Sequence, residues 1–146
     1  MATVTDGDIA RIPAGNLAVS REAFGRLWRE VEACAEAEAE TGMGTSTAQT
    51  AGMVLTCRWL ARATMEVNGR RFLAVRPVGR GSPLAYPELI EAEYVAAESA
   101  MERGPRGRPS HVMPGYLESV CAVLRWAWRR NGPRPGLPET APGAAV

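Results

Sequence analysis

The stretch AQTAGMVLTCRWLARATM, residues 48–65, decides the fold because its apolar residues do not all lie on one side of a helix. At helical spacing they form two opposite faces. One face holds Ala48, Ala51, Gly52, Leu55 and Trp59, and the other holds Met53, Cys57, Leu60, Ala61 and Thr64. A helix that is apolar on two sides is normally packed between layers or between subunits. The stretch therefore predicts a central helix, and Thr45 to Thr47 supply its N-cap.

Three further amphipathic helices are predicted around this one, over residues 20–42, 87–104 and 114–131. Ser20 suits the N-cap of the first, and a proline suits the first turn of each of the other two. Their apolar stripes are Phe24, Leu27, Trp28, Val31 and Ala35 in the first, Ile90, Tyr94, Ala97 and Met101 in the second, and Leu117, Val120, Cys121, Leu124 and Trp128 in the third.

The connecting segments give weaker signals. Asn68-Gly69 fits either a type I′ hairpin turn or the left-handed cap of the central helix, and the cap is favoured. Residues 66–78 are then extended or form a hairpin. Residues 1–19 are expected to be a flexible arm, and residues 132–146 a disordered tail rich in Pro, Gly and Ala. The fold class predicted is therefore all-α, with a four-helix domain over residues 20–131.

Charge is distributed in blocks along a chain whose net charge is only +1. All 17 basic residues are arginine, so chemistry that needs a lysine amine, such as a Schiff base or a P-loop, is excluded. The predicted helices over residues 20–42 and 87–104 are acidic, whereas the segments that follow each of them carry arginine. Such blocks favour pairing within a fold over binding of a polyanion.

No catalytic residue, metal site or cofactor is predicted. Cys34, Cys57 and Cys121 lack the short spacing of zinc ligands, lie on apolar helix faces, and have only His111 as a histidine partner. An odd number of widely spaced cysteines predicts reduced thiols and a cytoplasmic protein. With no apolar run long enough to span a bilayer, no membrane partner is expected. The glycine-rich stretches TGMGTST and GRGSP are weak candidates for anion binding.

Arg58 and Arg62 lie one turn apart at the edge of the central helix and require an anionic partner. Glu93, on the flank of the stripe of its own predicted helix, is the favoured one. The three residues are interpreted as a structural ion pair or, failing that, as an anion site.

Trp126 is the residue that this arrangement leaves unexplained. In a continuous helix it projects about 200° away from Trp128, outside the core stripe. Together with Ala122, Val123 and Arg130 it has the residue types of an interface hot spot. The arginines near the helix end also have a structural explanation, because cations there oppose the helix dipole.

These features favour a non-enzymatic cytoplasmic interaction protein that self-associates, or joins another subunit, through apolar helix faces with charged rims. One alternative is a nucleic-acid-associated accessory protein that binds phosphates through its arginine clusters. A second alternative is an enzyme of unknown chemistry, because sites assembled from distant residues leave no local signature.

Overall fold

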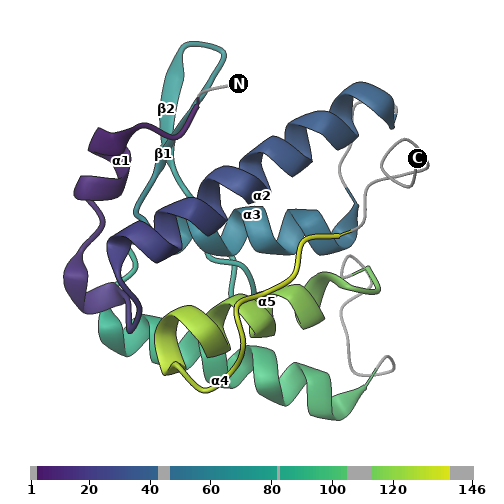
Figure 1. The fold of residues 1–146 in the computed structure, drawn as a ribbon. Helices are drawn as coiled ribbons and strands as arrows, with labels where there is room; N and C mark the ends of the chain where they lie inside the picture. Colours follow the sequence, from purple (N-terminus) through teal and green to yellow (C-terminus); the bar gives the residue numbers. More distant parts are fainter. Residues whose placement is uncertain (1–2, 43–46, 82, 105–112, 139–146) are drawn as a thin grey trace.

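The computed structural model describes residues 3–42, 47–81, 83–104 and 113–138 as a mostly helical fold with one small β-hairpin (Figure 1). In chain order the elements are α1 (Asp6–Ala10), the 3₁₀ turn η1 (Ala14–Asn16), α2 (Arg21–Thr41), α3 (Ala48–Leu60), β1 (Thr64–Val67), β2 (Arg70–Leu73), α4 (Pro87–Arg103), α5 (Tyr116–Leu124) and the π-helical turn η3 (Arg125–Arg129). The helical character is confirmed, but α1 and the hairpin add to the four helices predicted. In the described ranges, no helix is long and apolar enough to cross a membrane.

Three of the four predicted helix starts agree with the structure, while α5 begins at Tyr116, two residues after the predicted start at Pro114. The Ser20 side chain accepts a hydrogen bond from the Ala23 amide at 3.0 Å, and the Thr47 side chain accepts one from the Thr50 amide at 3.2 Å. Pro87 is the first residue of α4. These caps satisfy amides that have no partner inside the helix, which is why short polar side chains mark helix starts in the sequence.

Helix α3 is the centre of the domain, as its two apolar faces predict. It packs against α2 on one side and α5 on the other, and α4 packs against α5 (Figure 1). Its closest approach to α5 is at Gly52. A Cβ atom there would lie 2.1 Å from Ser119 Oγ and 2.7 Å from the Tyr116 carbonyl oxygen. The face of α3 that holds Gly52 is therefore packed against α5 of the same chain at this point.

The end of α3 corrects the preferred role of Asn68-Gly69. Arg62 adopts the left-handed conformation, with φ 55°. The Arg62 amide donates to the Trp59 carbonyl at 3.0 Å and the Ala63 amide to the Arg58 carbonyl at 2.9 Å. This is a Schellman motif, so the helix has already ended before the chain turns.

Asn68 and Gly69 instead form the tip of the hairpin, with φ of 52° and 77°. These angles fit the type I′ turn, which needs a left-handed conformation at both central residues. Thr64 is opposite Leu73 and Val67 is opposite Arg70 in the antiparallel register. The hairpin alternative, and not the cap, is therefore the correct reading of this stretch.

The expected flexible arm over residues 1–19 is packed onto the helices in its described part. Ile12 is fully buried, and the buried Asn16 side chain donates from Nδ2 to the carbonyls of Leu60 at 2.9 Å and Ala85 at 3.2 Å. The packing of this arm could not be predicted from the sequence. A single buried asparagine that donates to backbone carbonyls far away in the chain produces no periodic pattern.

The C-terminal tail is likewise ordered through residue 138, the last described before residues 139–146. Pro135 is buried, and Arg134 forms an ion pair with Glu30 of α2. Figure 1 shows this segment running back along α5. The composition of this segment predicts little regular structure. The segment is nevertheless packed, because it lies in an extended form beside α3 and α5.

The last predicted helix changes its geometry before its end. It is α-helical only to Leu124, and the wider π turn η3 follows. Because a π turn holds more residues than an α turn, the positions after it rotate relative to the stripe. Ala127 is fully buried, while Trp128 is half-buried and donates from Nε1 to Glu91 Oε1 at 2.8 Å. Trp128 therefore lies at the edge of the core and not within it.

Candidate functional site

Arg58 forms a buried ion pair that joins three elements. Its guanidinium donates from Nε and from Nη2 to the two carboxylate oxygens of Glu32 in α2, at 2.7 Å each. The two side chains are only 13% and 10% exposed, and Trp28 Nε1 donates to the same carboxylate at 3.0 Å. Arg58 Nη1 also lies 3.5 Å from Met65 Sδ at the base of the hairpin. The arrangement is structural, because the guanidinium is already engaged by the protein.

Glu93 is not the partner of Arg58, which corrects the favoured pairing. It is 2% exposed and accepts hydrogen bonds from the backbone amides of Val78 and of Gly79, the second at 2.9 Å. Its nearest guanidinium is that of Arg76, whose Nε lies 3.8 Å away. The partial positive charge of the backbone amides stabilises the Glu93 carboxylate. Pairing glutamates with arginines from the sequence overlooks such amides, which is why the partner of Glu93 was predicted wrongly.

Among the described residues, no carboxylate forms an ion pair with Arg62. Arg62 Nε donates to the Ala85 carbonyl at 2.7 Å. The same carbonyl also accepts the hydrogen bond from Asn16 Nδ2. Arg62 therefore ties the segment before α4 to the end of α3. The structure does not bring Arg58, Arg62 and Glu93 together into an anion site.

Both glycine-rich stretches considered for anion binding are occupied by a carboxylate of the same chain in their described parts. At the second stretch, Glu93 accepts a hydrogen bond from the Gly79 amide. At the first, Glu38 accepts from the Thr47 amide at 2.7 Å and from Thr50 Oγ1 at 2.8 Å. Burial opposes the charge of Glu38, yet these hydrogen bonds outweigh it and leave its pKa below the ordinary value. Part of each stretch, residues 43–46 and 82, lies outside the described residues.

The three cysteines are free and buried. Burial raises the pKa of all three thiols, that of Cys121 to about 12, and nearby glutamates add to the effect. Since the thiolate is the reactive form, these are poor nucleophiles. Within the ranges that the structure describes, no three His, Cys, Asp or Glu side chains cluster to hold a metal, and His111 falls outside those ranges.

The residues predicted to form an interface around Trp126 do not share one exposed surface. Val123 is fully buried, and Trp126 is partly buried against the core of its own chain. Ala122 lines a hollow, while Arg130 is exposed at the left-handed end of η3. The π turn changes the directions of Trp126 and Arg130 only, because Ala122 and Val123 precede it in the regular part of α5.

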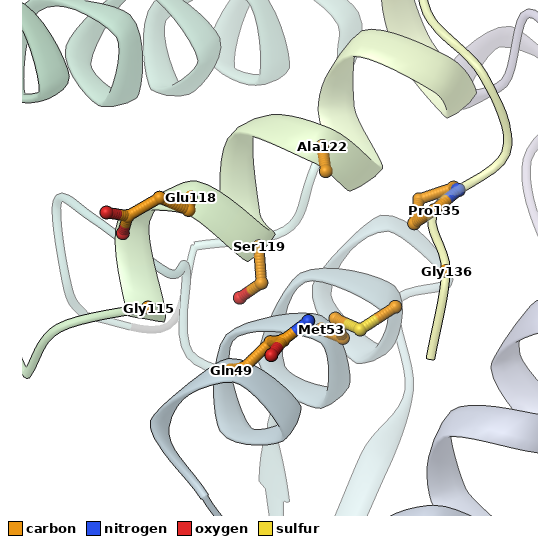
Figure 2. Close-up of a pocket in the computed structure, with 8 residues that line it drawn as sticks. All are labelled: Gln49, Met53, Gly115, Glu118, Ser119, Ala122, Pro135 and Gly136. Atoms are coloured by element: carbon orange, nitrogen blue, oxygen red, sulfur yellow. The ribbon is translucent and has the colours of Figure 1, made fainter. Parts of the chain in front are cut away.

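That hollow, of about 320 Å³, lies between α3, α5 and the C-terminal segment (Figure 2). It is lined by Gln49, Met53, Gly115, Glu118, Ser119, Ala122, Pro135 and Gly136. Ser119 Oγ donates to the Tyr116 carbonyl at 2.9 Å, and Figure 2 shows the Glu118 carboxylate pointing away from it. The lining holds no base beside the hydroxyl, so it has no arrangement for nucleophilic chemistry.

The hairpin carries the exposed apolar surface that the sequence did not single out. Side chains alternate across a strand, so the register places Met65, Val67, Arg70 and Phe72 on one face. Val67 and Phe72 are each 50% exposed, and all four residues of β2 are exposed. Neither Arg70 nor Arg71 has an ion-pair partner among the described residues. We call Val67, Arg70 and Phe72, which share this face, the hairpin surface; Arg71 lies on the opposite face, across from Glu66.

The available signal for this surface was Asn68-Gly69 between two short runs with β-branched and aromatic residues. Had the hairpin been preferred over the cap, its two strands would have had no predicted element to pack against.

Comparison of the chain with protein-family models, with curated protein sequences and with solved structures gives no match.

Proposed function

We propose that this protein is a non-enzymatic interaction protein that self-associates, and that the hairpin is its contact element. The observation that carries this proposal is the half-exposed pair Val67 and Phe72 on a hairpin that projects from the helices (Figure 1). A two-stranded hairpin alone is only marginally stable in water. A partner that covers one face would bury the aromatic ring and supply the missing layer.

The contact surface differs from the one that the sequence suggested. The two faces of α3 are covered by α2 and α5, and Val123 is in the core, so these residues have no free surface for a second copy. The hairpin surface combines the aromatic residue Phe72 with Arg70 on the same face, and aromatic and arginine side chains are enriched in protein interfaces.

Phe72→Asp is expected to dissociate the assembly. Wild-type protein should show a mass above the 15.7 kDa of one chain in light scattering, and the variant should remain at that mass over the same concentrations. Loss of a central aromatic contact costs about 2 kcal/mol or more, which is roughly a thirtyfold weaker association.

Met113→Asp is the matched control, since Met113 is 60% exposed but lies outside the hairpin. It should keep the wild-type mass. A wild-type protein that is monomeric at high micromolar concentration would contradict self-association.

A second candidate function is binding of single-stranded nucleic acid, which the placement of Arg70 and Phe72 on the same face favours. Bases stack on aromatic rings while arginine contacts the phosphates. Affinity for a fluorescent oligonucleotide should then fall steeply with salt, and Arg70→Ala should reduce the salt slope by about one. Equal affinity of wild type and Arg70→Ala/Phe72→Ala at low salt would exclude this use of the hairpin.

A further inference from the structure

The outer side of α4 carries an apolar residue between two acids that form no ion pair with any residue that the structure describes. Glu88, Ala92, Val95, Ser99 and Glu102 follow one another at intervals of four, three, four and three residues, so they form one stripe along the helix, which we call the α4 stripe. Val95 is 49% exposed, and Glu88 and Glu102 are exposed at the two ends. The stripe is about 21 Å long at the rise of an α-helix.

The other acids of α4 differ from these two. Glu91 pairs with Arg129, Glu98 with Arg125, and Glu93 accepts the backbone amides described above. Within the described part of the chain, only the acids of the outer stripe lack an ion-pair partner on this helix. Glu88 is stabilised in part by the helix N-terminus, whereas Glu102 lies near the C-terminus, where a negative charge is unfavourable.

The hairpin surface is complementary to this stripe. It presents half-exposed Val67 and Phe72 beside Arg70 on one face, and the stripe presents half-exposed Val95 between two acids. The two surfaces cannot meet within one chain. Figure 1 shows the hairpin and α4 at opposite ends of the molecule, with α2 and α3 between them.

We infer that the hairpin of one copy docks on the α4 stripe of a second copy. This inference rests on the proposed self-association and adds the acceptor surface and the arrangement. Because the two surfaces differ and lie at opposite ends, the contact is head-to-tail, and it either repeats along a chain of copies or closes into a ring. The opposite charges also make the association weaker at high salt.

Two single substitutions test the arrangement, Phe72→Asp in the hairpin and Val95→Asp in the α4 stripe. Each should weaken self-association at least tenfold, because every copy then has one defective surface. Mixed in equal amounts, the two variants should form a 1:1 pair and nothing larger, since one intact hairpin and one intact stripe remain. The mass of the mixture measures this, with Met113→Asp as control and circular dichroism to verify the fold of each variant.

The outcomes separate the inference from the proposed function. If Phe72→Asp becomes monomeric while Val95→Asp keeps the wild-type mass, the hairpin is the contact element but α4 is not its acceptor. If both variants become monomeric yet their mixture stays monomeric, the head-to-tail arrangement is overturned. If the wild type is monomeric and binds an oligonucleotide through Arg70, both self-association and the α4 acceptor are wrong.

Discussion

Gly52→Ala is expected to lower the free energy of unfolding by about 2–3 kcal/mol, although alanine is the better helix former. The added methyl group would lie 2.1 Å from Ser119 Oγ and 2.7 Å from the carbonyl oxygen of Tyr116. The serine hydroxyl can rotate away, but the carbonyl belongs to the backbone of α5. The two helices must therefore separate at their closest contact, which loosens the core on both sides of α3.

Gly25→Ala is the matched control in a second buried glycine of a helix. Its Cβ would lie 2.5 Å from Cδ1, 2.9 Å from Cγ1 and 3.1 Å from Cγ2 of Ile9, which are all side-chain atoms on the short helix α1. That side chain can move, so the change in stability should stay within about 1 kcal/mol, as alanine also favours the helix. Urea unfolding of both variants gives the comparison. Equal stability of Gly52→Ala and wild type would show that the helices are not in close contact there.

Glu32→Ala is expected to cost about 3 kcal/mol or more, because it leaves the buried Arg58 without its carboxylate. The loss also removes the acceptor of Trp28 Nε1. Arg58→Met should cost less than Glu32→Ala, since methionine fills part of the space and leaves no buried cation, although Glu32 then keeps only the indole bond.

Replacing both partners tests whether the cost comes from the stranded charge. Glu32→Leu combined with Arg58→Met should be clearly more stable than Glu32→Ala, since an apolar pair of similar size is often neutral relative to a buried ion pair. Unfolding of Glu32→Leu, of Arg58→Met and of the variant with both completes a double-mutant cycle. Additive effects of the two substitutions would mean that the residues contribute independently and that the ion pair does not determine the stability.

The main helices follow from the sequence because periodicity and caps are local signals. Ser20, Thr47 and Pro87 mark starts that the structure reproduces. The end of α3 was harder to predict because its left-handed residue is Arg62, where glycine or asparagine is the usual signal. The π turn after Leu124 gives no signal at all in a pattern read with one fixed period, so the roles of Trp126 and Trp128 were misassigned.

The candidate surface could be predicted only in part. Charge blocks indicate that acids and arginines pair, and Arg58 does bind a glutamate of the first long helix. They do not say which acids remain unpaired, because Glu93 and Glu38 are satisfied by backbone amides that carry no sequence signature. Phe72 is exposed because no described helix covers that part of the hairpin. This depends on the arrangement of the whole fold and not on residues 64–73 alone.

The central place of α3 also sets the order in which the protein can form during synthesis. Its partner α2 is made before it, but α5 begins only at Tyr116, after the hairpin and α4. Until those residues leave the ribosome, the side of α3 that holds Gly52 has no cover. Contacts between such distant segments close late and slow folding. The newly made chain is therefore most prone to aggregate while α3 is complete and α5 is still missing.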